Sequence, residues 1–476
     1  MNVLITGSTG FIGRATVAYL QGQGHSITAL VRSIGRASNL LGQGIRLIEY
    51  SDAEQDLIDE MDKSDLVINL AGTPVATRWT KNKKRGLSES RIGVTNKIVN
   101  AIKQCNNPPK TLISASAVGY YGNRGDESLT ESSEKGYGFL SQLCEEWEES
   151  ALEARSSGTR VCVLRIGIVL GREGGILGTL GPLFENHMGG YVGSKQYVPW
   201  IHIHDMVKVI GECITKESLS GPINCVAPIA VTNKEFSLEL KHATKSKILL
   251  RIPSLLLKPI FGEATQVLTN SQNVKPTVLN SAGFTFKFQT LSEALNNEFQ
   301  DTNINIQKYQ RDNTDTDQHK NPYRIKERGQ YQLTSDMVLS RDSDTLFAFF
   351  SSPLNLGLLT PGWMDFRITE IPNQIESGSY IRYRIGLWFI GLHWVTKIVT
   401  WAPNNLFIDN QEKGPYGLWW HEHLIIDNHD GTVTMRDRVI YRIPFWIFGR
   451  IAHKLFVKNT LMRIFRFRKQ MINLRF

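Results

Sequence analysis

The sequence predicts two folded domains, an α/β domain with a doubly wound parallel sheet over residues 1–298 and an α+β domain over residues 330–476. A glycine-rich turn follows the first apolar run, and short apolar runs then alternate with helical patterns. The composition changes after residues 299–329, where Gln, Asn, Asp, Thr and Lys dominate and predict a solvated linker. The length of 476 residues exceeds that of one ordinary domain, and a hydrophobic content of 41% is sufficient for proper cores.

The first element is the apolar run Val3–Thr6, which leads directly into Gly7-Ser-Thr-Gly10-Phe-Ile-Gly13. A strand, three glycines at this spacing and a helix are typical of a turn that binds a dinucleotide pyrophosphate. Gly7 would make the tight turn, Gly10 would let the phosphates approach the backbone, and Gly13 would let the helix pack on the strand. The helix N-terminus would add N–H donors. The cofactor contacts expected here are those of Gly7, Thr9, Gly10, Phe11, Ile12 and Gly13.

The second predicted strand, residues 25–31, ends at Arg32, and no Asp or Glu stands beside it. Enzymes that prefer NAD usually place an acid at this strand end for the ribose 2′-hydroxyl, whereas an arginine accommodates the 2′-phosphate of NADP. We therefore expect NADP rather than NAD as the cofactor. The alternative is that Arg32 is only a solvated charge at the end of a strand.

The rest of the first domain continues the alternation. Apolar runs at residues 66–70, 111–114 and 161–165 are typical of buried parallel strands, and residues 143–154 have a helical pattern. Arg91, on a helix that starts near residue 87, is expected to reach a phosphate or the substrate, unless it is a solvated helical charge. The residues expected to line the cofactor after the run at 66–70 are Leu70, Ala71 and Gly72.

Several motifs of the first 298 residues together resemble one known group of enzymes. The glycine-rich turn is accompanied by Asn69-Leu-Ala-Gly72, Ser114-Ala-Ser-Ala-Val-Gly-Tyr-Tyr-Gly122, Arg165-Ile-Gly167 and Pro199-Trp-Ile-His-Ile-His-Asp205. The set resembles the extended short-chain dehydrogenase/reductases, which include the NAD-dependent epimerases and dehydratases. It is most similar to an epimerase-family branch that is sometimes labelled cell-division-inhibitor-like. The resemblance implies a Rossmann-type domain, a nicotinamide dinucleotide and a small-molecule substrate.

In that superfamily, the resemblance implies catalysis by a Ser or Thr after the fifth strand and by a Tyr-x-x-x-Lys pair on the next helix, in which the Lys lowers the pKa of the Tyr. Ser116 matches the hydroxyl position, but the best register places Phe139 and Leu143 where the Tyr and the Lys would stand. Tyr137 is no substitute, because a serine stands four residues after it. The usual pair is therefore missing, and the candidate catalytic residues are Ser116, Tyr120 and Tyr121.

Two histidine pairs, His202 with His204 and His421 with His423, each place two imidazoles on one face of a strand. Imidazoles in such an arrangement can ligate a metal ion. No third ligand stands at metal-binding spacing near either pair, so the sequence predicts no metal site.

After Tyr331 the composition changes, and seven of the ten tryptophans lie between Trp363 and Trp446. Alternating segments at residues 379–385, 394–401, 419–425 and 433–441 predict an antiparallel sheet, and Asp430-Gly431 marks a hairpin between the last two. A long helix is expected from about residue 446 to 476.

The pattern of the second domain resembles the START/Bet v 1-like helix-grip fold of the SRPBCC superfamily, which includes polyketide cyclases and lipid-transfer domains. A first strand over Tyr331–Leu339, short helices over residues 343–353 and the closing helix carry the resemblance. It implies a curved sheet around the long helix and a cavity for a hydrophobic ligand. The aromatic residues that could line such a cavity, or be ordinary core, are Phe366, Tyr383, Trp388, Trp394, Trp420 and Tyr441.

The net charge of +9 comes almost entirely from residues 450–476, which hold eight Lys or Arg and no acid. A charge excess so localised is poor evidence for a nucleic-acid partner, and none is expected. The apolar residues near helical spacing in this segment predict a stripe that packs on the sheet, with weak contact to a membrane surface as the alternative. They are Ile451, Leu455, Met462, Phe465 and Ile472.

We expect a cytoplasmic protein. Residues 1–6 already have the pattern of a strand rather than a signal peptide, and the five cysteines have no disulfide or metal spacing. The leading hypothesis is an NADP(H)-binding epimerase- or reductase-like oxidoreductase for a carbonyl or sugar-like substrate, fused to a domain that binds an apolar ligand. One rival is a catalytically silent NADP(H) sensor, favoured by the missing Tyr–Lys pair. Another is a peripheral membrane protein anchored by the basic C-terminal helix.

Overall fold

The computed structural model describes residues 1–50, 54–172, 174–300, 303–310, 328–387 and 390–476. The chain divides into two compact units. The first comprises Met1–Ile34 and Gly44–Gln300, and the second comprises Gly35–Gln43 and Asp301–Phe476.

The first unit is built on a seven-stranded sheet in the order β12-β7-β5-β4-β1-β2-β3, and every neighbouring pair is parallel. The central strands are buried on both faces, as expected from their continuous apolar runs. The predicted doubly wound α/β fold is therefore confirmed. The strands of this sheet are β1 Asn2–Thr6, β2 Ser26–Val31, β3 Ile45–Glu49, β4 Leu66–Asn69, β5 Thr111–Ala117, β7 Arg160–Ile166 and β12 Gly221–Cys225.

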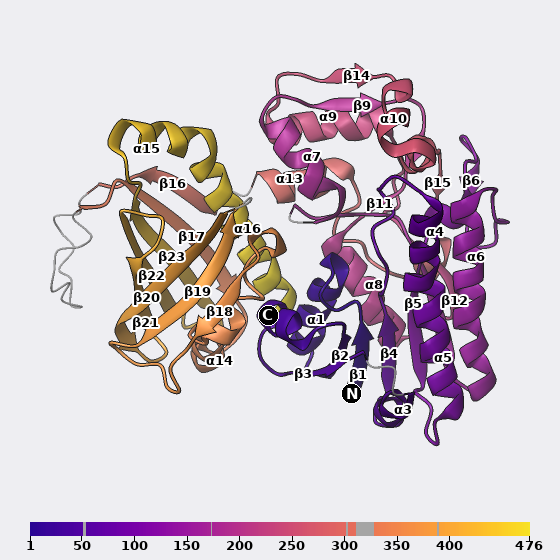
Figure 1. Cartoon of the computed structure of the whole chain (residues 1–476), viewed down its shortest axis with the longest axis horizontal. Coiled ribbons are helices and arrows are strands. Elements are labelled where there is room, and N and C mark those ends of the chain that lie inside the picture. The colour runs from indigo at the N-terminus through magenta and orange to yellow at the C-terminus, as the bar shows by residue number, and fades with distance from the viewer. Residues whose placement is uncertain (51–53, 173, 301–302, 311–327, 388–389) are drawn as a thin grey trace. The chain divides into compact units, whose positions relative to one another are not determined.

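Helices cover both faces of this sheet (Figure 1). One face packs against α3, α5 and α6 in a single apolar core that includes Leu4, Val67, Ile98 and Ala151. The helices of the first 300 residues are α1 Phe11–Gly22, α2 Ile34–Leu41, α3 Glu54–Asp62, α4 Lys81–Ser88, α5 Val94–Gln104, α6 Phe139–Leu152, α7 Gly175–Glu185, α8 Ile203–Thr215, α9 Asn233–Thr244, α10 Lys258–Phe261, α11 Gln266–Thr269, α12 Thr277–Ser281 and α13 Leu291–Phe299.

Beyond the main sheet, the first unit contains four two-stranded sheets, which pair β10 with β13, β11 with β8, β14 with β9, and β15 with β6. A second apolar core, which includes Phe184, Trp200 and Phe236, lies among α7, α9 and α13. The short strands are β6 Ser128–Leu129, β8 Ile168–Leu170, β9 Gly190–Val192, β10 Tyr197–Val198, β11 Trp200–His202, β13 Val231–Thr232, β14 Leu250–Ile252 and β15 Asn273–Val274.

The second unit contains an eight-stranded antiparallel sheet in the order β16-β17-β23-β22-β21-β20-β19-β18. The predicted hairpin at Asp430-Gly431 is confirmed, because β22 and β23 pair on either side of it and Gly431 has a φ of +83°. The strands are β16 Ile304–Lys308, β17 Tyr331–Leu339, β18 Arg367–Glu370, β19 Tyr380–Leu387, β20 Ile390–Ala402, β21 Leu406–Lys413, β22 Leu418–Asp427 and β23 Val433–Arg442.

The segment expected to be a linker, residues 299–329, contains a strand. Residues 304–308 form β16 and pair antiparallel with β17, which places Ile304 and Ile306 in the apolar core of the second unit. The alternation of Ile304-Asn-Ile306 with polar neighbours was too short to stand out in a polar stretch. Residues 301–302 and 311–327 of the predicted linker lie outside the described residues.

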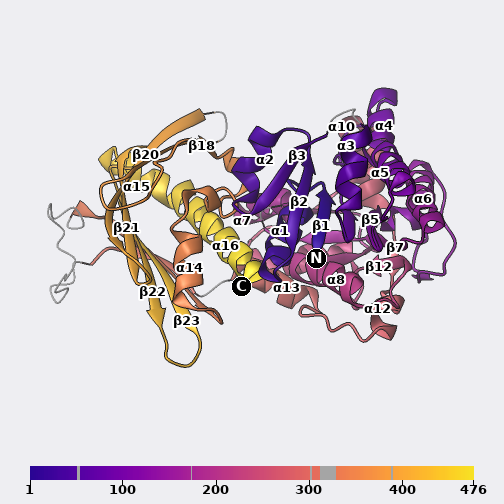
Figure 2. The same ribbon diagram turned by 90° about the horizontal axis from the view of Figure 1, so that it is seen from below.

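The C-terminal segment divides into a core helix and an exposed helix. In α16, Lys458–Arg475, Phe465 and Ile472 are buried, and Phe465 belongs to the apolar core that the helix shares with the sheet. Figure 2 shows α16 running alongside the strands of this unit. In α15, Trp446–Ala452, and the π-helical turn His453–Val457 that follows, Ile451 is 51% exposed and Leu455 is 64% exposed. The predicted inward stripe is therefore correct for the second half of the segment and wrong for Ile451 and Leu455. The remaining helix of this unit is α14 Ser343–Phe350.

Among the described residues, no helix has the length and apolar character needed to cross a bilayer.

We predict that Phe465→Ala lowers the free energy of unfolding of the second unit by about 3–5 kcal/mol, the usual cost of removing a buried aromatic ring. Phe448→Ala is the matched control, because the Phe448 side chain is 78% exposed. Surface substitutions of that kind change stability by less than about 0.5 kcal/mol. Urea unfolding followed by tryptophan fluorescence measures both variants, since most tryptophans lie in this unit. Equal effects of the two substitutions would contradict the assignment of α16 to the core.

Candidate functional site

The strand order of the parallel sheet reverses between β1 and β4, and ligands of doubly wound sheets bind at the carboxyl ends of the strands at such a point. Buried hydrogen bonds fix the two strand ends there. Thr6 Oγ1 donates to Asn69 Oδ1 at 2.7 Å, and Asn69 Nδ2 donates to Thr95 Oγ1 at 2.8 Å. The end of β1, the end of β4 and the start of α5 are thereby held together.

The glycine-rich turn passes so close to its neighbours that two of its residues have no room for a side chain. Gly7 has a φ of +69°, and a Cβ on it would lie 2.4 Å from the carbonyl oxygen of Leu70. A Cβ on Gly13 would lie 2.1 Å from the carbonyl oxygen of Gly7. Gly10 is exposed and has more space, because its Cβ would lie 3.2 Å from that same oxygen. The roles expected for the three glycines agree with this geometry.

The turn has the polar groups that an anion requires. No side chain caps the N-terminus of α1, so the first N–H groups of the helix are available to a ligand. The Ser8 hydroxyl is buried and has no hydrogen-bond partner among the described residues. The predicted contact residues Thr9 and Ile12 are half-buried beside it. These features fit a dinucleotide pyrophosphate.

Phe11 closes one side of the turn, a role that the sequence did not reveal. Its ring fills the space in which side chains at Gly171 and Gly174 would stand, with ring atoms 2.6 and 2.2 Å from the respective Cβ positions. Glycines at these two positions therefore let the segment after β8 pack on the first turn of α1. No local pattern could have linked residues so far apart in the chain.

Arg32 lies at the carboxyl end of β2 with an exposed side chain. Its guanidinium makes no hydrogen bond or ion pair within the part of the chain that the structure describes. Ser33 and Ile34 follow it, so the chain carries no acid directly after the end of β2.

The segment after β4 brings Gly72 and Arg91 together. A Cβ on Gly72 would lie 3.3 Å from the Arg91 guanidinium, whose Nη2 donates to the carbonyl oxygen of Thr73 at 2.8 Å. Burial lowers the pKa of Arg91 below its usual range. Arg91 belongs to a π-helical turn, Glu89–Gly93, and such turns are frequent at functional sites. Leu70 and Ala71 are half-buried in the same segment.

Ser116 belongs to a buried network with a carboxylate and a guanidinium. Its hydroxyl donates to Glu148 Oε1 at 2.6 Å, and Arg165 donates to Glu148 through Nε at 3.0 Å and Nη2 at 2.9 Å. All three residues are at least 95% buried. Burial alone would lower the pKa of Arg165, but its hydrogen bonds to Glu148 raise that pKa above the usual range. Removing one partner of such a pair typically costs about 3–5 kcal/mol.

Sequence reasoning missed Glu148, although a signal was present. Cys144, Trp147, Glu148 and Ala151 follow helical spacing and are all buried. A carboxylate on the apolar face of a helix requires a buried partner, and Arg165 is a cation within the apolar run of the strand that follows.

The two candidate tyrosines have different environments. Tyr121 is fully buried, and its hydroxyl donates to Asn224 Oδ1 at 2.7 Å and accepts from Arg165 Nη1 at 3.0 Å. Burial raises the pKa of Tyr121 to about 12. Tyr120 is half-buried, and the Arg165 guanidinium lies 3.6 Å from its ring centroid. The Tyr120 hydroxyl makes no hydrogen bond to any described residue, so it is the freer of the two.

The positions that would hold a Tyr-x-x-x-Lys pair are occupied by an apolar cluster. Leu143 is buried with Trp79, Leu87 and Ala264, and the Phe139 ring packs edge-on against Trp79 with ring centroids 5.2 Å apart. Tyr137 points into solvent and is 96% exposed. No ammonium group can therefore approach Tyr120 from α6 in the way that the usual lysine approaches its tyrosine.

The histidine pair at residues 202–204 has structural partners. His202 Nε2 lies 2.8 Å from Glu298 Oε1, and His202 Nδ1 accepts from the backbone N–H of His204. Asp205 accepts from the backbone N–H groups of Lys287 and Phe288. These contacts join α8 to the end of the first unit. Both ring nitrogens of His202 have protein partners, so neither is open to a metal ion.

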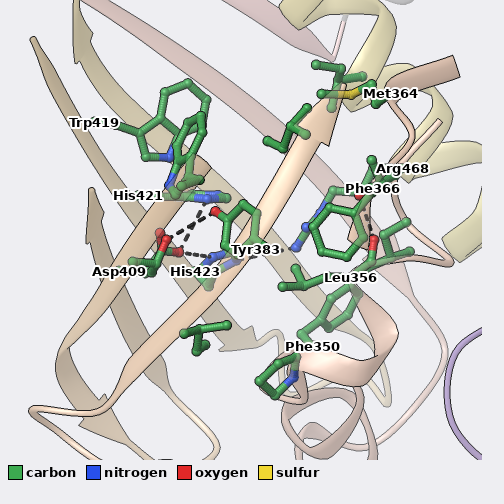
Figure 3. Close-up of a pocket in the computed structure, with 18 of the residues that line it drawn as sticks. Phe350, Leu356, Met364, Phe366, Tyr383, Asp409, Trp419, His421, His423 and Arg468 are labelled. Atoms are coloured by element: carbon green, nitrogen blue, oxygen red, sulfur yellow. Dashed lines mark hydrogen bonds and ion pairs between the residues drawn. The ribbon is translucent and has the colours of Figure 1, made fainter. Parts of the chain in front are cut away.

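The second unit contains a cavity of about 190 Å³ between α16 and the antiparallel sheet. Most of its lining is apolar, and Figure 3 shows the side chains that surround it. Of the aromatic residues expected there, Phe366, Tyr383 and Trp394 line the cavity. Trp420 and Tyr441 are buried elsewhere in the cores of this unit, and Trp388 lies outside the described residues.

Comparison with known proteins shows to which family the first 300 residues are similar. Residues 3–225 match the sequence model of the NAD dependent epimerase/dehydratase family, and residues 252–298 match DUF1731, a domain of unknown function. The chain is 38% identical over 304 residues to the chloroplastic epimerase family protein SDR39U1 homolog of Arabidopsis thaliana, and the match covers 62% of this chain and 86% of that protein. The chain belongs to the NAD-dependent epimerase/dehydratase family.

Other family members give the same result. An epimerase family protein of Mycobacterium leprae is 37% identical over 296 residues, and the match covers 62% of this chain and 94% of that protein. The solved structure of human epimerase family protein SDR39U1 (isoform 2) with NADPH is 30% identical, has a TM-score of 0.56, and matches 63% of this chain and 99% of that one. The family resemblance that the sequence motifs indicated is confirmed for the first unit.

Proposed function

We propose that the first unit binds NADP(H) and acts as an oxidoreductase on a small carbonyl or sugar-like substrate. The observation that carries the proposal is the Arg32 guanidinium at the end of β2, which has no partner among the described residues, in a sheet that also has the glycine-rich turn. A guanidinium can bind a 2′-phosphate through two charge-assisted hydrogen bonds. The human relative SDR39U1 was solved with NADPH, which supports the same cofactor here.

In this proposal Ser116 and Tyr120 are the groups that meet the substrate oxygen, and the nicotinamide supplies or accepts the hydride when it is bound. Tyr121 instead fixes Arg165, which in turn lies over the Tyr120 ring. Arg165 is therefore the cation that lies beside Tyr120, where the usual arrangement has a lysine.

A catalytically silent NADP(H) sensor is the second candidate. Two observations favour it: Phe139 and Leu143 belong to an apolar cluster, and the Ser116 hydroxyl already donates to Glu148. NADP(H) binding does not depend on either feature, because the glycine-rich turn, Arg32 and the end of β4 come from other elements.

For the second unit we propose a START-like helix-grip domain that binds an apolar ligand in the cavity beneath α16. The apolar lining and the position of α16 across the sheet support this role. Because the two units are covalently linked, a ligand held by one would be present at high effective concentration for the other.

A weak contact with an anionic membrane surface is a further role that the exposed part of the C-terminal segment supports. Phe448 is 78% exposed and Leu455 is 64% exposed, and Arg450, Lys454 and Lys458 are exposed between and beside them. Apolar side chains with interspersed cations, and no acid, suit the interface of anionic lipids.

The cofactor proposal predicts that the unmodified protein binds NADPH at least about tenfold more tightly than NADH, which corresponds to roughly 1.4 kcal/mol. Arg32→Ala should remove most of that preference, because it removes the partner of the 2′-phosphate. Arg155→Ala is the matched control, since Arg155 is exposed but lies before the amino end of β7, whereas Arg32 lies at the carboxyl end of β2. Fluorescence titration measures each affinity, and equal affinities in the unmodified protein would contradict the proposal.

The oxidoreductase proposal predicts that Ser116→Ala lowers turnover by ~10²-fold or more and leaves NADPH affinity nearly unchanged. Phe139→Tyr alone should restore no ordinary dehydrogenase activity, because Leu143 provides no ammonium. The assay follows NADPH oxidation with a panel of carbonyl compounds, and Ser132→Ala, at an exposed position, is the control. If no carbonyl compound is reduced and Ser116→Ala has no effect, the sensor becomes the better interpretation.

The membrane proposal predicts that the protein floats with vesicles containing phosphatidylserine and not with purely zwitterionic vesicles. Binding should weaken with salt, since each cation contributes about 1 kcal/mol at such a surface. Phe448→Ala should reduce flotation severalfold, whereas Val338→Ala, at a site that is 65% exposed on β17, should leave it unchanged. Flotation that is equal for both variants would exclude this segment as the contact.

A further inference from the structure

One end of the cavity in the second unit holds a cluster of titratable side chains that the proposed function does not use. Asp409 lies on β21, His421 and His423 lie on β22, and Asp437 lies on β23. Strand register brings them together, because Asp409 pairs with His421 and His423 pairs with Asp437 across the sheet. Figure 3 shows Asp409, His421 and His423 pointing toward one another inside the cavity.

Both imidazoles lie between the two carboxylates. Asp409 Oδ2 lies 3.0 Å from His423 Nε2 and 3.6 Å from His421 Nδ1. Asp437 Oδ1 lies 2.9 Å from His423 Nδ1 and 3.1 Å from His421 Nε2. Each ring nitrogen of the pair therefore faces a carboxylate oxygen.

The two carboxylates differ in their charged partners. Asp437 Oδ2 lies 3.1 Å from Nε of Arg468, whereas among the described residues Asp409 makes ion-pair contacts only with the two imidazoles. A metal cation between the imidazoles and Asp409 would supply a positive charge on that side of the cluster.

The distances suit ligands of a metal ion. One donor atom from each of Asp409, His421 and His423 lies within 4.8 Å of the others. Donors at 2.0–2.2 Å from a tetrahedral Zn²⁺ are about 3.4 Å apart. The separations of 3.0 and 3.6 Å from Asp409 Oδ2 fall on either side of that value.

The surroundings supply the outer partners that metal-bound histidines usually have. Asp437 lies against the second nitrogen of both rings, and such a carboxylate fixes the tautomer and orientation of ligating imidazoles. Asp437 is held in turn by Arg468 of α16, whose Nε lies 3.1 Å from Asp437 Oδ2.

We propose that His421 Nδ1, His423 Nε2 and Asp409 Oδ2 bind a divalent first-row transition-metal ion of the Zn²⁺ or Fe²⁺ type at the polar end of the cavity. Two imidazoles and one carboxylate favour such ions over Mg²⁺ or Ca²⁺, which prefer oxygen ligands alone. Three protein ligands leave at least one coordination position, and the three residues line the cavity. That position is available to an oxygen atom of a ligand whose apolar part occupies the rest of the cavity.

The sequence alone could not reveal this site. His421-Glu-His423 is visible as a pair, but the third ligand comes from the neighbouring strand, and only the register of β21 against β22 brings it within reach.

The test uses full-length protein that has been stripped of metal with a chelator and then titrated with Co²⁺, whose visible absorption reports nitrogen and oxygen coordination. We expect one Co²⁺ per chain, displaced by stoichiometric Zn²⁺ and unaffected by millimolar Mg²⁺. Asp409→Asn and His423→Gln should each weaken binding at least tenfold. His429→Ala is the matched control, because His429 lies 3.8 Å from Asp427 at an exposed turn of the same sheet.

X-ray absorption on the Zn²⁺-loaded wild-type protein provides a measurement that does not depend on whether the variants fold. Scattering from two imidazoles and from at least one further light atom is expected. Less than half an equivalent of bound Co²⁺, a zinc environment without imidazole, or wild-type affinity in a folded Asp409→Asn variant would overturn the proposal.

Discussion

The close approach of two backbone segments at the carboxyl ends of β1 and β4 is the constraint on which the nucleotide site depends. Gly7 passes the carbonyl of Leu70 at a distance that excludes any side chain, and Gly13 passes Gly7 in the same way. The bond between Thr6 and Asn69 holds the two strand ends in that position. The N-terminus of α1, which no side chain caps, and the buried Ser8 hydroxyl belong to the same turn, and Arg32 lies at the end of the neighbouring strand β2, so one steric requirement bears on several groups of the proposed nucleotide site.

Local sequence patterns predicted the parts of the structure that local geometry determines. The turn at Gly7–Gly13, the ends of β2 and β4 and the hairpin at Asp430-Gly431 follow from backbone conformation and apolar periodicity within a few residues. The partners of Ser116 could not be found in this way, because Glu148 and Arg165 come from a helix and a strand that only the fold brings together. The contact between Asp409 and His421 could not be predicted for the same reason, because the two residues lie on different strands. The strand β16 was not predicted because its neighbours in the sequence are polar.

The first unit differs from the usual Tyr–Lys arrangement in the element that carries the cation. The face of α6 that would carry the pair packs against Trp79 and Ala264. The cation beside the Tyr120 ring is instead Arg165, which belongs to β7. Arg165 cannot change its position freely, since Glu148 and Tyr121 hold it in a buried network. The polar groups proposed to take part in the chemistry are therefore also part of the buried core, so a substitution among them is expected to change stability as well.

The strand β16 determines where a fragment that contains only the second unit should begin. Its residues Ile304–Lys308 pair with Tyr331–Ser335 of β17, which would otherwise present unpaired N–H and C=O groups on that side. A fragment that begins at residue 330 keeps the closing helix but loses that protection and uncovers apolar surface that Ile304 and Ile306 cover. Such a fragment would tend to associate edge to edge with further copies, whereas one that begins before residue 303 would keep its sheet capped.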